Sequence, residues 1–199
     1  MGRNAGGVNG ASGLRGATER GYTTKMLENI VGKEREYRSE KIEYAHIYTQ
    51  EGDLISTKKG GKNYVNVGNS PENAIVTHNH PGKAAEGGWL ITFSHQDLNY
   101  AVSHNLKEMR AVSRTHTFSM KRPPNGWGEK AKRYDIKKKY KEIERGILKG
   151  DIARIRSLVD RGKHAEAKKL SIKLDNERTH KTVKAVAEFF GWQYTMKKG

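Results

Sequence analysis

Alternating apolar and polar positions divide much of this chain into short extended segments. Between positions 41 and 49, Ala45 and Ile47 fall on one face of an extended chain, while Tyr44 and His46 fall on the other. This follows because successive side chains of a strand point to opposite sides. The turn around Gly52 predicts a hairpin into a strand over 54–57. Further strands are predicted at 64–67, 74–80, 109–114, 115–121 and 192–196.

Helical periodicity accounts for most of the remaining chain. Apolar residues at positions 26, 27, 30 and 31 predict an amphipathic helix over 23–38 that packs on the domain or on a partner. Ser94 is a suitable N-cap for a helix over 94–105. After a break at 122–128, helices are predicted at 129–145, 152–159, 163–174 and 177–190, with Asp151 capping the second and Gly191 ending the last.

These elements predict an α/β (α+β) fold in which a mixed β-sheet is flanked by helices. Residues 1–20 are rich in Gly and Asn and show no periodicity, which is typical of a disordered tail. We divide the remainder into an N-terminal amphipathic helix at 21–38 and a domain at 39–199. The domain includes a basic helical insert at 129–175.

The strand and the helix on either side of a glycine-rich connection carry the candidate chemistry. In the motif His78-Asn79-His80-Pro81, both imidazoles point to the same side of the strand, which should end at the proline. Ser94 and Asp97 then lie in the first turn of the following helix. Two imidazoles and one carboxylate are the ligand set of a catalytic Zn²⁺ site that keeps a position open for water. His78, His80 and Asp97 are therefore the predicted metal ligands.

The His-Asn-His-Pro tetrapeptide followed by the Ser-x-x-Asp helix start resembles the JAMM/JAB (MPN) zinc metallopeptidase family. The likeness is to its RadC-like branch, and most closely to the JAB-like domains of phage head-associated proteins. It implies an MPN/JAB-like catalytic domain with a layout like that of cytidine deaminases. It also implies an upstream glutamate on a strand: Glu43 matches this position, with Glu40 as the alternative in another register. The connection after His80 is longer than the family's, and the additional residues fall within 82–90.

The resemblance implies a zinc-dependent hydrolase that cleaves a peptide or isopeptide bond with a metal-activated water. Glu43 would act as general base and acid. The hydroxyl of Ser94 would donate a hydrogen bond to the oxyanion. The substrate would be a protein or peptide, and the family's known members remove ubiquitin-like modifiers. We expect the other histidines His95, His104 and His116 to be surface residues, although His95 lies close enough to the helix start to contact substrate.

Charge and composition add two further expectations. The formal net charge is +16, and from Lys121 onward 23 Lys and Arg residues stand against 10 Asp and Glu residues. This excess favours contact with nucleic acid or an acidic protein surface, and it is equally typical of a self-repelling soluble surface. The sequence has no apolar run that could span a bilayer and no signal-peptide core, so we expect a cytoplasmic protein without membrane contact. The absence of cysteine excludes disulfides and thiolate zinc sites.

Two other functions are compatible with these residues. The basic C-terminal part, with its Lys run at 137–139, suits a nucleic-acid-binding or -processing protein. The phage resemblance also allows a virion-associated structural module with a vestigial metal site. The natural substrate and the oligomeric state are not predicted.

Overall fold

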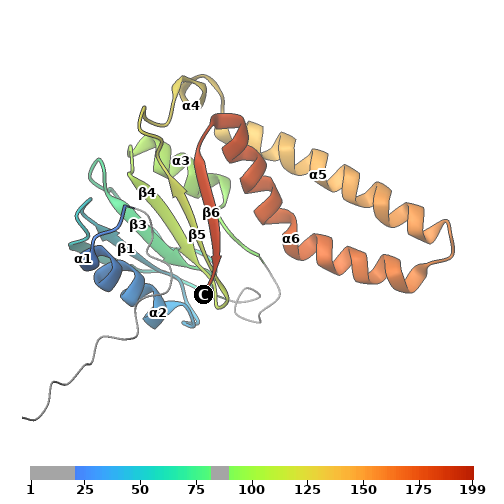
Figure 1. Ribbon diagram of the computed structural model, residues 1–199, viewed down its shortest axis with the longest axis horizontal. Helices are drawn as coiled ribbons and strands as arrows, with labels where there is room; N and C mark the ends of the chain where they lie inside the picture. The colour runs from blue at the N-terminus through green and yellow to red at the C-terminus, as the bar shows by residue number, and fades with distance from the viewer. Residues whose placement is uncertain (1–20, 82–89) are drawn as a thin grey trace, which may run out of the picture.

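The computed structural model describes residues 21–81 and 90–199 (Figure 1). The tail expected at 1–20 and nearly all of the longer loop expected at 82–90 lie outside the described residues. The elements in chain order are α1 (Thr24–Met26), the π-helical η1 (Leu27–Gly32), α2 (Lys33–Tyr37), β1 (Tyr44–Tyr48), β2 (Leu54–Lys59), β3 (Ile75–Asn79), α3 (His95–Ser103), β4 (Glu108–Val112), β5 (His116–Lys121), α4 (Glu129–Arg133), α5 (Ile136–Val159), α6 (His164–Phe190) and β6 (Gln193–Lys198).

A six-stranded mixed sheet with the order β2-β1-β3-β4-β5-β6 forms the centre of the fold. Only β3 and β4 pair in parallel, and α3 is the connection between them, as a parallel pair requires a crossover. The other pairs are antiparallel. The predicted α/β class with a mixed sheet flanked by helices is therefore confirmed.

The N-terminal helices α1, η1 and α2 cover one face of the sheet (Figure 1). Met26 and Ile30 pack against Tyr48 of β1 and Ile75 of β3, and all four side chains are buried. The turn between β1 and β2 closes against the same helices, because Gly52 has a φ of 93° and its Cα faces Met26. A Cβ at this position would lie 2.8 Å from the Cγ and 3.0 Å from the Cα of Met26, and the positive φ strains any other residue, so the turn favours glycine.

The opposite face of the sheet carries the main core. Val76, Met109 and Phe118 lie on this face of successive strands and pack against Leu98 of α3 and Val186 of α6. The apolar stripe predicted for the helix after Ser94 therefore faces the sheet, as amphipathic periodicity requires. Gly191, with a φ of 77°, ends α6 as predicted, and the chain returns as the edge strand β6.

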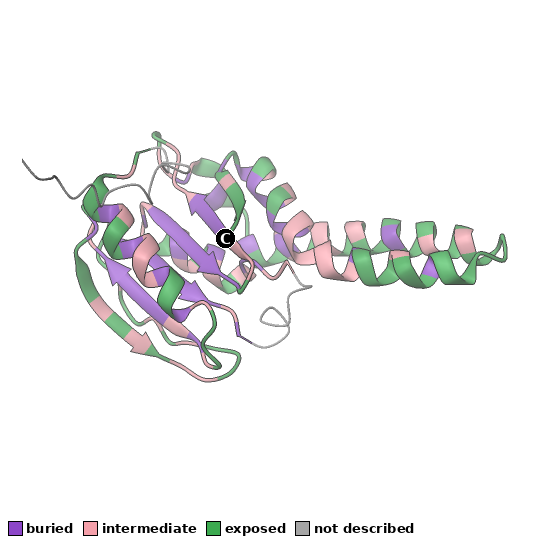
Figure 2. Cartoon of the chain, turned by 60° about the horizontal axis from the view of Figure 1, so that its bottom comes forward, coloured by how far each residue is buried: buried purple, intermediate pink, exposed green. Residues whose placement is uncertain are grey.

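Helices α5 and α6 form a hairpin whose distal part extends away from the globular body (Figures 1 and 2). The end of the hairpin nearest the sheet contributes Tyr140 and Phe190 to the core. The distal part is mostly exposed (Figure 2), although Ala167 and Leu174 of α6 are buried. None of the helices in the described ranges has the length and apolar character needed to cross a membrane.

Several predicted boundaries are wrong. Residues 64–67 form no strand and run as an irregular segment. Asp151 does not cap a helix, because it is buried within the continuous α5; the residue that caps α5 is Asp135, whose side chain accepts a hydrogen bond from Lys138 N. The helices predicted at 163–174 and 177–190 are a single helix, α6. In the hairpin, packing of α5 on α6 outweighs the local stop signals.

Candidate metal centre

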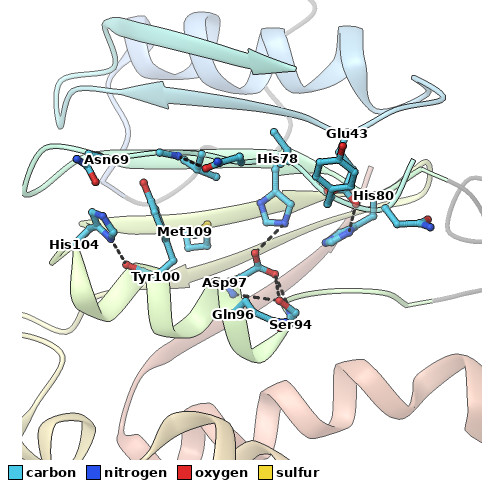
Figure 3. Close-up of a pocket in the computed structure, with 16 residues that line it drawn as sticks. Glu43, Asn69, His78, His80, Ser94, Gln96, Asp97, Tyr100, His104 and Met109 are labelled. Carbon is cyan, nitrogen blue, oxygen red and sulfur yellow. Dashed lines mark hydrogen bonds and ion pairs between the residues drawn. The ribbon is translucent and has the colours of Figure 1, made fainter. Parts of the chain in front are cut away.

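The carboxyl end of β3 and the start of α3 bring the predicted ligands together. His78 is the fourth residue of β3 and His80 follows the strand directly, so both imidazoles lie on the face that α3 covers. Figure 3 shows His78 pointing from the sheet toward Asp97 on α3. One nitrogen or oxygen atom of each of His78, His80 and Asp97 lies within 4.8 Å of the other two. The sequence prediction of these three residues as one cluster thus agrees with the geometry.

A capping box fixes the carboxylate of Asp97. Its Oδ2 accepts hydrogen bonds from the backbone N of Ser94 at 2.7 Å and from the Ser94 Oγ at 2.8 Å. The Asp97 backbone N in turn donates to Ser94 Oγ at 3.2 Å. The second oxygen, Oδ1, lies 3.7 Å from Nε2 of His78. Ser94 therefore sets the orientation of Asp97 and leaves Oδ1 directed at the imidazole.

Both histidines present buried ring nitrogens that could coordinate a metal ion. Nε2 of His78 and Nε2 of His80 are both buried, and neither has a hydrogen-bond partner within the described ranges. A buried nitrogen without a partner costs about 1–3 kcal/mol, which a coordinated cation would remove. Burial, followed by the neighbouring His78, lowers the pKa of His80 to about 4. His80 is therefore neutral at neutral pH, which is the form that binds a metal.

These donors fit a zinc ion. Bonds from Zn²⁺ to imidazole nitrogen and carboxylate oxygen are about 2.0–2.2 Å long, so donor atoms within 4.8 Å of one another are within reach of a single ion. The same donor set also holds non-haem Fe(II) in some oxygenases, so the residues select a class of site rather than a single element. Among the described residues this is the only such group of three or more.

Glu43 lies beside this cluster because of the pairing between β1 and β3. Ala45 of β1 pairs with His78 of β3 in the antiparallel ladder. Glu43, two residues before Ala45, therefore lies opposite His80, two residues after His78. Oε1 of Glu43 lies 3.9 Å from Nδ1 of His80. Burial, and then the charge of Asp97, raises the pKa of Glu43 to about 7. The alternative residue Glu40 is not at this site and lines a separate cavity beside His46, whose side chain is on the other face of the sheet.

Asn79 holds the segment that carries Glu43. Its side chain lies on the opposite face of β3, where Oδ1 accepts a hydrogen bond from Tyr44 N at 2.6 Å. Its Nδ2 donates to the Ile42 carbonyl at 3.0 Å. The amide thus binds the backbone on both sides of Glu43. Strand alternation alone places Asn79 on the side away from His78 and His80, but it does not show that Asn79 holds the segment carrying Glu43.

A cavity of about 550 Å³ opens onto the cluster (Figure 3). Glu43, His78, His80, Ser94 and Asp97 all line it. Its outer wall is the irregular segment 63–69, and its far end is formed by residues of α3 and the turn after it, including Tyr100 and His104. These wall residues belong to no sequence motif, so the sequence alone does not identify them as part of the site.

Tyr100 and His104 form the far end of this cavity as a stacked pair. Their rings lie 4.0 Å apart with an interplanar angle of 26°. The Tyr100 hydroxyl also hydrogen-bonds Ser70 Oγ at 2.6 Å, which ties α3 to the wall segment. His104, expected to be a surface residue, is therefore part of the cavity, whereas His95 and His116 are not among its lining residues.

Known proteins provide no further identification. No family model, curated protein or solved structure matches the chain. The interpretation of the site therefore depends on its own residues and geometry.

Proposed function

We propose that the protein is a zinc-dependent hydrolase of the JAMM type that cleaves a peptide or isopeptide bond. The observation that carries the proposal is the convergence of three metal-ligand side chains with one carboxylate that is near the ligands but not among them. The ligands come from His78, His80 and Asp97, and the additional carboxylate is Glu43. A glutamate placed in this way distinguishes a hydrolytic zinc site from a purely structural one.

One residue of the chain, Glu43, would carry both proton transfers of the reaction. A Zn²⁺ ion on these ligands would supply a bound water of lowered pKa and a Lewis acid for the substrate carbonyl. Glu43 is the residue that would accept a proton at this site and return it to the leaving nitrogen. Its raised pKa, about 7, suits both transfers near neutral pH, because a general base works best when its pKa is close to the working pH.

Ser94 would serve this reaction in two ways. Its hydroxyl donates to Asp97 Oδ2, so its first role is to orient a metal ligand. To stabilise the oxyanion it would have to redirect this same proton to the substrate. These two roles predict different effects of removing the hydroxyl, because only the first changes the affinity for metal.

The order of the elements also supports a JAMM/JAB (MPN) arrangement of the RadC-like kind. The chain presents a glutamate next to a strand, a His-x-His-Pro strand end and a Ser-x-x-Asp helix start in the family's order. The mixed sheet with α3 between its two parallel strands is compatible with that layout. The cavity beside the cluster has room for a short stretch of polypeptide, which favours a protein or peptide substrate.

Hydrolysis of defined substrates tests the proposal. Zinc-loaded protein is incubated with a fluorogenic peptide library and with a lysine-linked isopeptide library, with and without a chelator. We expect cleavage that the chelator stops and that His78→Ala/His80→Ala abolishes. His116→Ala is the matched control, since this histidine lies on β5 and is not among the residues lining the cavity. Cleavage that persists in the double variant would contradict the proposal.

A further inference from the structure

Helix α5 runs through the part of the hairpin that extends from the body (Figure 2), and its sequence there carries a row of aliphatic residues. Leu148, Ile152 and Val159 are 37%, 48% and 41% exposed, and the half-buried Ile155 lies between the last two. Their spacing alternates between four and three residues, which aligns all four along one side of a helix. Single exposed aliphatic residues are ordinary on a protein surface, but a continuous row of them is typical of an interface.

Cations border this row on one flank. Arg145, Lys149 and Arg156 are exposed. Lys149 and Arg156 lie seven residues apart on the same side of the aliphatic row, and Arg145 continues the row at its N-terminal end, three residues before Leu148. None of the three forms an ion pair with an acidic side chain of the described chain. The acidic residues of the distal hairpin are in part already engaged, since Asp151 lies 3.9 Å from Arg154 and Glu166 lies 3.0 Å from Lys163.

The hairpin as a whole is strongly basic in this region. Between positions 145 and 173 the chain has nine Lys and Arg residues against three Asp and Glu residues. Charges held on a projecting element of this kind attract a partner of opposite sign and orient its approach. The exposed cations therefore favour a partner with negative charge, and the aliphatic row favours a partner with an apolar face.

We propose that this surface, the outer face of α5 made of Leu148, Ile152, Ile155 and Val159 with the bordering cations, docks an acidic amphipathic helix of another protein. The alternate four- and three-residue spacing is that of a helix–helix seam, which a second helix with the same spacing can fill. Glutamate or aspartate on the flank of that helix would pair with Lys149 and Arg156, and an acidic side chain at its end would pair with Arg145. The proposal does not depend on the metal centre.

Two other occupants fit the face less well. Nucleic acid would satisfy the cations through its phosphates, but it would leave the aliphatic row without an apolar counterpart. A second copy of the chain would pair its α5 with this one in antiparallel orientation about a two-fold axis. The same flank of the two helices would then be in contact. Lys149 would then lie beside Arg156 of the other copy, and this like-charge contact opposes association.

Binding of a synthetic probe tests the proposal. The probe is a labelled amphipathic peptide with leucine at the first and fourth positions of each heptad and glutamate on both flanks. Its binding to the full-length protein is followed by fluorescence anisotropy. We expect binding that weakens by about tenfold or more in Ile152→Ser/Val159→Ser and in Lys149→Glu/Arg156→Glu. The same peptide with lysine on its flanks should not bind.

Matched variants separate this face from general basicity. Ile172→Ser removes an isoleucine of α6 that is 55% exposed and lies off the aliphatic row. Lys168→Glu/Lys169→Glu changes the net charge by the same amount as the variant on α5. Both controls should alter peptide affinity by no more than about twofold. Circular dichroism and thermal unfolding confirm that every variant is folded.

Three results would overturn the proposal. The first is failure of the acidic peptide to bind the wild-type protein. The second is tight binding of duplex DNA that both charge-reversal variants weaken equally, which would identify a nucleic-acid surface. The third is a concentration-dependent dimer, seen by sedimentation, that Ile152→Ser/Val159→Ser dissociates, which would identify a second copy as the occupant.

Discussion

Arg110 joins the N-terminal helices to the sheet through a buried network of charges. Its guanidinium is fully buried and donates to Glu34 of α2 at 2.6 and 2.8 Å and to Glu108 of β4 at 2.9 Å. Arg110→Met keeps an apolar stem in place but removes the cation. Glu34 would then remain buried with a hydroxyl donor from Thr77, whereas Glu108 would keep the hydroxyls of Tyr22 and Ser119 and the Lys121 ammonium at 3.8 Å. We expect the variant to lose about 3–5 kcal/mol of unfolding free energy, the typical cost of breaking a buried ion pair.

Urea unfolding of metal-free protein, monitored by circular dichroism at neutral pH, measures this loss. Lys33→Ala is the control, because it breaks the exposed Lys33–Glu36 pair of the same helical segment and should cost less than about 1 kcal/mol. The double variant Glu34→Leu/Arg110→Met should recover part of the loss, since it removes one of the uncompensated carboxylates. The reasoning is refuted if Arg110→Met costs no more than Lys33→Ala.

Four further predictions concern the site and the opposite face of the sheet. Glu43→Gln should keep its zinc and lose about 10²–10⁴-fold in hydrolysis rate, measured by single-turnover kinetics. Ser94→Ala should weaken zinc binding by about 10–100-fold in a competition titration, because the hydroxyl orients Asp97. Asn79→Ala should lower kcat by about 10²-fold at unchanged zinc content, because it releases the backbone around Glu43. Burial lowers the pKa of His46 from 6.5 to about 4. The unfolded chain therefore binds the proton more readily, and the unfolding free energy falls as the pH decreases from 6.5 to about 4. His46→Phe should remove about 3 kcal/mol of this pH dependence, measured by urea unfolding of the metal-free protein.

Each of these predictions has a contradicting result. Full activity of the Glu43 variant would mean that another group accepts the proton. Unchanged zinc affinity in the Ser94 variant would mean that its hydroxyl serves only the oxyanion. Loss of zinc from the Asn79 variant would show a general disruption of the strand end rather than misplacement of a carboxylate. An unchanged pH dependence in the His46 variant would assign the titration to other groups.

The core of the candidate site could be predicted because its signals are local. Strand alternation is enough to place His78 and His80 on the same side, and a Ser-x-x-Asp start is enough to place Asp97 in the first turn of a helix. Glu43 lies near the cluster only because β1 pairs with β3. The sequence indicates the role of Glu43 only through the family resemblance. The contact of Glu43 with the cluster depends on the register that sets Ala45 opposite His78.

The parts that could not be predicted depend on tertiary packing. Residues 64–67 read as a strand by residue type, yet they belong to the irregular segment 63–69 that lines the cavity. Asp151 directly follows Gly150 and resembles a helix cap, yet α6 packs along α5 and the helix continues through it. Asn79 acts through side-chain hydrogen bonds to a strand that is distant in sequence, and no local pattern encodes such contacts.

The most direct test of the metal centre is the metal content of the purified protein, measured for zinc and iron together. The proposed site predicts about one zinc per chain in the wild-type protein and in Glu43→Gln, and none in His78→Ala/His80→Ala. His116→Ala should retain the full amount. Iron in place of zinc would contradict the hydrolase, and a zinc content that the double variant does not change would contradict the site itself.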